Sequence, residues 1–138
     1  MQLLADLRDH QYVHLALLRK LLGSWAVPDL DVYHAPTTYA NRTSTLTNGI
    51  YWEDLAVAAY NGVAKVFTDT NLTLLTIKMG TVQARHSAYQ REILNHNTYT
   101  DATVVDSDGM GKTLPPSTVI KTLMNYCSNK FDISKLPS

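Results

Sequence analysis

Residues 50–94 read IYWEDLAVAAYNGVAKVFTDTNLTLLTIKMGTVQARHSAYQREIL, two amphipathic segments joined by a short polar link. Apolar residues recur every three to four positions on both sides of the link at 68–71, which predicts helices over 50–67 and 72–94. The Thr and Asp residues of the link supply the cap of the second helix. Because the link is so short, we expect the two helices to be antiparallel neighbours.

Both of these helices place polar groups on their predicted inner faces: Glu53 on the first, Gln83 and His86 on the second. Glu53 and His86 lie equally far from the link, each about 21 Å along its helix, so they should face each other. A buried carboxylate or imidazole is costly unless it is hydrogen-bonded, paired or metal-bound. We therefore expect these side chains to meet.

An amphipathic helix is also predicted over residues 2–22, and it repeats the same polar motif. Its inner heptad positions are Leu4, Leu7, Gln11, His14, Leu18 and Leu21. Gln11 and His14 have the i, i+3 spacing of Gln83 and His86, which places each pair on one helical face. Di-metal carboxylate bundles use this spacing as Glu-x-x-His, and here an amide replaces the acid twice.

Two interpretations of these polar residues remain open. In one, His14, Glu53 and His86 hold a single zinc or iron ion, with Gln11 and Gln83 as weak ligands or hydrogen-bond acceptors. A di-iron centre is disfavoured, because one carboxylate compensates four positive charges poorly. In the other, which we favour, no metal or cofactor is bound and the polar groups fix the helix register by bonding to one another.

The remaining segments predict a long crossover and a final helix. Gly23 should end the first helix, and residues 24–49 are Pro-, Thr- and Asn-rich without helical period, with Thr47 or Asn48 capping the next helix. A loop of this length can run the ~30 Å of a helix and make helices 2–22 and 50–67 parallel, as in ferritin-type bundles. Pro116 should begin a last helix over about 117–129.

Composition bounds the class of protein. The chain has 138 residues, 45% of them apolar, with 12 basic and 12 acidic side chains, which fits one globular domain over residues 1–138. The balanced charge indicates no nucleic-acid or membrane partner, and the single Cys127 excludes an intramolecular disulfide. No signal peptide or membrane span is expected, and the compartment is unknown.

Other patterns in the sequence say less about function. Residues 106–113 complete neither an EF-hand nor a phosphate loop and predict a flexible turn, and no serine has a nucleophile-elbow context, so we assign no catalytic residue. A third possibility is a pocket for a small apolar ligand between helices, lined by Met79, Met124 and Tyr60.

Three runs together resemble a known family. The run after His14, LALLRKLLGSWAVP, then WEDLAVAAYNG from Trp52, then VQARH ending at His86, resembles the ferritin-like domain of desiccation-related and fungal stress-response proteins. The order and spacing match over roughly residues 4–94. The resemblance implies a ferritin-like bundle with Glu-x-x-His on its second and fourth helices and an acid opening its third.

Carried over residue by residue, His14, Glu53 and His86 match the family pattern, whereas Gln11 and Gln83 stand where glutamates belong. The family's first bundle helix has no counterpart. We expect either a truncated chain or a groove covered by the 117–129 helix or by a second copy in a homodimer.

The sequence therefore predicts an all-α, degenerate ferritin-like bundle that has lost most of its di-metal chemistry. We expect a structural or interaction role, stress-related by resemblance, and favour a non-enzymatic protein. The alternative is a metal-binding protein or metal-dependent oxidase that uses His14, Glu53 and His86.

Overall fold

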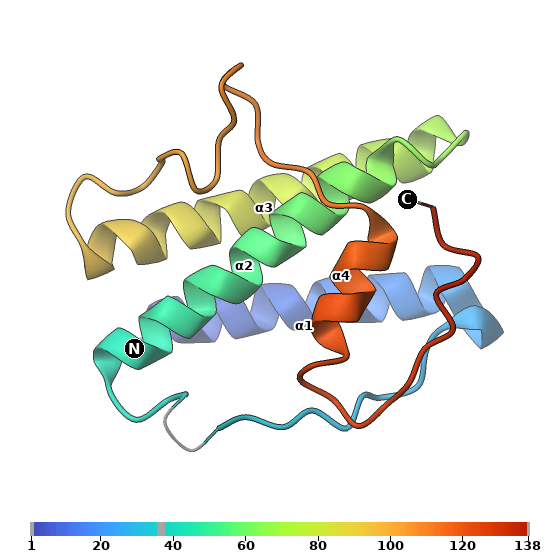
Figure 1. The fold of residues 1–138 in the computed structure, drawn as a ribbon, viewed down its shortest axis with the longest axis horizontal. Coiled ribbons are helices and arrows are strands. Elements are labelled where there is room, and N and C mark those ends of the chain that lie inside the picture. The colour runs from blue at the N-terminus through green and yellow to red at the C-terminus, as the bar shows by residue number, and fades with distance from the viewer. Residues whose placement is uncertain (1, 36–37, 138) are drawn as a thin grey trace. The chain divides into compact units, whose positions relative to one another are not determined.

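The computed structural model describes residues 2–35 and 38–137, with elements in the order α1, η1, α2, α3 and α4 (Figure 1). Regular secondary structure in these ranges is helical, and extended backbone contributes two isolated bridges. The predicted all-α class is confirmed. The chain divides into two compact units, one ending at Asp31 and the other beginning at Val32.

The first unit contains α1 (Gln2–Leu22) and the short 3-10 helix η1 (Gly23–Trp25). The predicted bounds of this first helix are confirmed. Gly23 has a φ of +54°, in the left-handed region that favours glycine, and this conformation ends the α-helix. Arg19 in the last turn pairs with Asp29, which ties the chain beyond η1 back to the helix.

The second unit opens with α2 (Arg42–Ala64), whose start differs from the prediction. Asn41 caps the helix: its side chain accepts from Ser44 N at 2.9 Å, and Ser44 Oγ accepts from Asn41 N at 3.1 Å. A helix beginning at Ile50 with a cap at Thr47 or Asn48 is therefore wrong. Residues 42–49 form the first turns of α2 because this reciprocal cap outweighs their weak helix propensity. The helix ends at Ala64, before the predicted Phe67.

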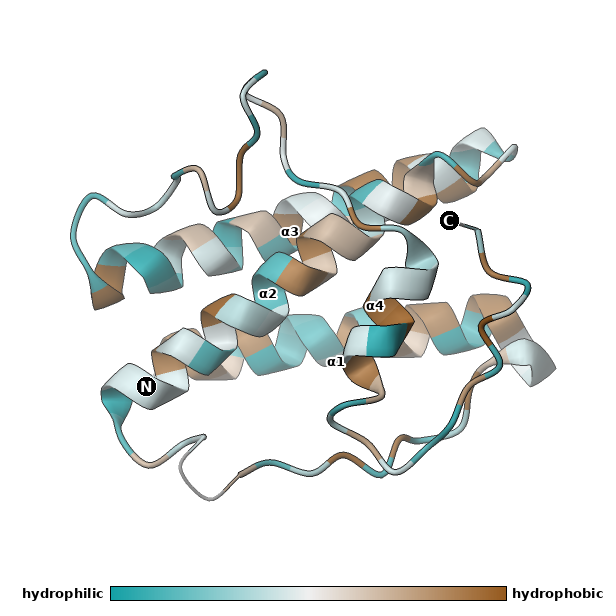
Figure 2. Cartoon of the chain, viewed as in Figure 1, coloured by the Kyte–Doolittle hydropathy of each residue, from teal (hydrophilic) through white to brown (hydrophobic). Residues whose placement is uncertain are grey.

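The next helix, α3 (Thr70–Leu94), is capped by Asp69, which accepts from Asn71 N at 2.8 Å. Figure 1 shows α2 and α3 side by side and antiparallel, as the short link predicts. α3 buries a helical stripe that is mostly polar: Thr76, Met79, Gly80, Gln83, His86, Ser87 and Gln90. Figure 2 shows hydrophilic residues along both α2 and α3.

The last helix, α4 (Pro116–Leu123), begins at the predicted proline but is shorter than predicted. Beyond it, Cys127 forms a bridge with Val32, and Tyr33 N donates to Tyr126 O at 3.0 Å. The Tyr126 ring also packs edge-on against Trp52 of α2, 4.7 Å between centroids. These contacts hold the chain extended, so a helix continuing to residue 129 is wrong.

Candidate functional site

Glu53 of α2 and His86 of α3 meet between the two helices. His86 Nδ1 lies 3.3 Å from Glu53 Oε1, and the two residues are only 8% and 7% exposed. The predicted encounter at a common height is thus confirmed. Ionisable groups buried this deeply are rarely found without a partner. Here Glu53 and His86 are partners of each other.

Gln83 completes the contact from one turn earlier on α3. Its Oε1 lies 3.1 Å from the same His86 Nδ1, and Gln83 is 2% exposed. A nitrogen flanked by two oxygen acceptors is best satisfied when it carries the proton. We therefore assign the proton to Nδ1, which donates to Glu53 and Gln83.

Gln90 extends the buried polar row by one further turn. Its Nε2 donates to the His86 carbonyl oxygen at 3.4 Å. The amide fits because Gly49 of α2 has no side chain, and a Cβ there would collide with Gln90 Oε1. Gln90 was not predicted from the sequence, because Gly49 was assigned to the loop over residues 24–49. A glycine opposite an inward-facing glutamine would have been the signal.

Tyr60 lies about two turns after Glu53 on α2, where that helix and α3 approach closely. A Cβ built on Gly80 would come within 3.2 Å of the Tyr60 Cβ. Burial, and then the negative charge of Glu53, raise the pKa of Tyr60. The phenol, which is protonated over the physiological range in any case, thus holds its proton to a higher pH than a free tyrosine does.

Gln11 and His14 belong to α1, in the first unit. His14 Nδ1 is shielded from solvent and has no hydrogen-bond partner among the described residues. Partial burial, and then the neighbouring His10, lower the pKa of His14. The three-ligand combination of His14, Glu53 and His86 draws on both units and stays a prediction.

A second polar network, which was not predicted from the sequence, joins the same two helices. It lies on the face that residues 99–114 cross, which we call the outer side. Asp54 Oδ1 accepts from Ser87 Oγ, its Oδ2 accepts from Arg91, and Arg91 Nε also donates to Ser87 Oγ at 3.4 Å. Arg91 further pairs with Asp101 at 3.6 Å. Applied to Asp54 and Ser87, the helix-rise argument places both within about 3 Å of a common height, and this was the available signal.

Sequence comparison assigns the class of protein that this all-helical architecture and inward polar pair suggest. The profile of the ferritin-like domain family, described as "Ferritin-like domain", matches residues 1–96. The chain belongs to this family, and its fold is that of a ferritin-like helical bundle. Neither the curated proteins nor the solved structures contain a match to the chain. None of the described helices is both long enough and apolar enough to cross a membrane.

The donor set of the second unit fits a ferritin-type di-metal centre poorly. The buried faces of α2 and α3 offer one carboxylate, Glu53, and one imidazole, His86, while Gln83 and Gln90 are neutral amides. Two divalent ions need several carboxylates to balance their charge. Over residues 2–35 and 38–137, no three or more His, Cys, Asp and Glu side chains lie close enough to hold a metal ion.

Proposed function

We propose that this chain is a degenerate ferritin-like domain whose di-metal chemistry is lost and whose buried polar cluster serves a structural role. The cluster consists of Glu53, Gln83 and His86. One observation carries the proposal: His86 Nδ1 lies 3.3 Å from Glu53 Oε1 and 3.1 Å from Gln83 Oε1, so protein groups supply the hydrogen-bond partners that this imidazole nitrogen needs.

Such a cluster fixes the register of α2 against α3. A shift of either helix by one residue would turn these groups away from one another and leave them buried without partners, which costs several kcal/mol per charge (about 3–5). Apolar contacts alone tolerate such shifts better, because they are non-directional. The cluster thus selects one register of α2 against α3.

The resemblance to desiccation-related and fungal stress-response proteins supports a stress-related role for this domain. The absence of a strong charge imbalance, with 12 basic and 12 acidic residues, favours a protein partner over a nucleic acid.

The deciding experiment is metal analysis of the chain purified without chelator. We expect much less than one iron or zinc per chain, and His86→Ala should lower the unfolding midpoint without changing the metal content. His96→Ala is the matched control, because His96 is an exposed histidine that pairs with a carboxylate, Glu92, outside the cluster. Stoichiometric metal that disappears in His86→Ala but persists in His96→Ala would establish the alternative, a metal-binding protein or oxidase using His14, Glu53 and His86.

We also propose a second copy of the chain as the partner. Leu74 and Ile77, one turn apart on α3, are 50% and 51% exposed, and together they form an apolar surface. Sedimentation should show a dimer that Ile77→Lys dissociates. A well-folded monomer at all concentrations would contradict this part of the proposal.

A further inference from the structure

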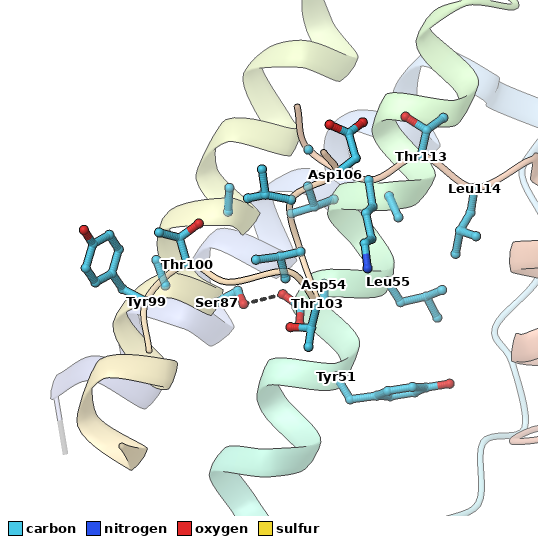
Figure 3. Close-up of a pocket in the computed structure, with 18 residues that line it drawn as sticks. Tyr51, Asp54, Leu55, Ser87, Tyr99, Thr100, Thr103, Asp106, Thr113 and Leu114 are labelled. Carbon is cyan, nitrogen blue, oxygen red and sulfur yellow. Dashed lines mark hydrogen bonds between the residues drawn. The ribbon is translucent and has the colours of Figure 1, made fainter. Parts of the chain in front are cut away.

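The second unit contains a pocket of about 800 Å³ on the outer side of α2 and α3. The two helices form its floor, and residues 99–114 cross over it as a roof (Figure 3). Its volume is in the range of small-molecule sites, about 300–1,000 Å³. Met79, Met124 and Tyr60, the residues expected to line a ligand pocket, are not part of it.

The roof is fixed to the α3 side of the floor at its beginning. Arg91 pairs with Asp101 at 3.6 Å, and its carbonyl accepts from Thr98 Oγ1 at 3.0 Å. Asp101 itself is held by Thr103, whose hydroxyl and backbone N–H both donate to it. Hydrogen bonds from Thr103, and then the charges of Arg91 and Lys112, lower the pKa of Asp101, so this anchor stays charged.

The roof is fixed to α2 at its other end. Leu114 N donates to Ala58 O at 3.0 Å, and Asn61 Nδ2 donates to Lys112 O at 3.0 Å. The close approach needs Gly62, because a Cβ there would collide with the Leu114 carbonyl. Between its two anchors the roof braces itself, with Lys112 N bonded to Val104 O at 3.0 Å. The pocket is therefore preformed, which lowers the cost of filling it.

The walls define the chemistry of a ligand. Leu55, Ala58, Ala84 and Ala88 supply an apolar floor. At its polar side, Figure 3 shows Asp54 bonded to Ser87, with Thr103 of the roof beside them. Arg91 pairs with Asp54 and Asp101, whereas Lys112 donates to the neutral Ala102 carbonyl at 2.7 Å and Asp106 accepts from Met110 N at 2.9 Å. The lining carries both signs of charge and is mostly apolar, so a largely apolar ligand without net charge is favoured.

Asp54 nevertheless retains the capacity to bind a ligand donor. Each of its carboxylate oxygens accepts one bond in the structure, and an ionised carboxylate has about four acceptor positions. Its side chain is 25% exposed, so it is accessible from the pocket. We propose that this pocket binds a neutral, largely apolar small molecule with one hydroxyl group, which donates a hydrogen bond to Asp54.

The test is fluorescence titration of the full chain with 2-naphthol, a neutral apolar alcohol near pH 7. We expect saturable binding that Ala84→Leu weakens at least about tenfold, because the leucine fills the floor of the pocket. Thr81→Leu adds the same side chain to an exposed position of α3 that does not line the pocket, and it should leave the affinity unchanged. Absence of saturable binding, or equal affinities in the two variants, would overturn the proposal.

Naphthalene is the matched probe for the hydroxyl contact. The wild-type chain should bind 2-naphthol about tenfold more tightly than naphthalene, since only the naphthol can donate a hydrogen bond to the charged acceptor. Asp54→Ala should remove this preference and keep binding of naphthalene. Equal affinity of the wild-type chain for both probes would overturn the assignment of Asp54 as the ligand acceptor. Neither titration depends on the Glu53–His86 pair, so the outcome is independent of the metal analysis.

Discussion

Two polar networks join α2 and α3, and they use adjacent residues of each helix. Glu53 meets His86 in the interior, whereas Asp54 meets Ser87 on the outer side. One step along a helix turns a side chain by about 100°, and this step separates a sealed site from one beside a pocket. The side chain of Glu53 is 9% exposed and that of Asp54 is 25% exposed. Two neighbouring carboxylates on α2 thus differ both in exposure and in the partners that α3 offers them.

The largest expected effect comes from truncating the two acids separately. Glu53→Ala should lower the free energy of unfolding by about 3 kcal/mol, because it leaves His86 and Gln83 buried with one partner fewer. Asp54→Ala should cost about 1 kcal/mol, since Asp54 is partly exposed and Arg91 keeps its pairing with Asp101. Urea unfolding measures both values. Equal losses would erase the distinction between the interior and outer networks.

A smaller effect is expected at Gly62, where the backbone of the roof contacts α2. Gly62→Ala should cost about 2 kcal/mol, because the Leu114 backbone must move to make room. Gly80→Ala is the matched control: its Cβ would meet the Tyr60 side chain, whose nearest atom is the Cβ at 3.2 Å, and the gain in helix propensity of about 1 kcal/mol offsets the tight fit. If Gly80→Ala proves the more damaging of the two, the roof does not depend on its anchor at α2.

Arg91→Lys should loosen the roof while sparing the helices. Lysine cannot reproduce the several hydrogen bonds that the guanidinium makes to Asp54, Ser87 and Asp101. The amide of Lys112, bonded to Val104 O, should exchange with solvent about tenfold faster, whereas amides in the middle of α2 should not change. Hydrogen exchange followed by NMR provides the measurement. Uniform acceleration across α2 would instead show that the two networks unfold together.

The smallest effect concerns alkaline pH. Because the pKa of Tyr60 is raised, the folded chain holds this proton more tightly than the unfolded chain does. The resulting stability is complete below the ordinary tyrosine value of 10.0 and is lost as the pH rises through the folded pKa. Tyr60→Phe should therefore flatten part of the alkaline decline in urea unfolding experiments. Tyr51, whose pKa is raised by burial and by Tyr126, should account for part of what remains. An unchanged slope in Tyr60→Phe would exclude this contribution.

The interior network could be predicted from sequence, and the outer one was not. Helix periodicity and the short link at 68–71 place Glu53 opposite His86 by simple geometry, and the structure confirms it. The roof could not be predicted, because its position depends on tertiary contacts such as Gly62 against Leu114, which leave no periodic pattern. The start of α2 failed for a local reason: Asn41 and Ser44 cap a stretch rich in threonine and asparagine, which favours a loop assignment.

NMR of the His86 imidazole tests most directly whether protein groups alone satisfy the buried cluster. The ring signals are assigned by their loss in His86→Ala. We expect one tautomer, protonated at Nδ1, whose resonances do not change when equimolar zinc is added to the chelator-treated chain. A ring protonated only at Nε2, or zinc-dependent shifts that saturate at one ion per chain, would contradict a metal-free structural role.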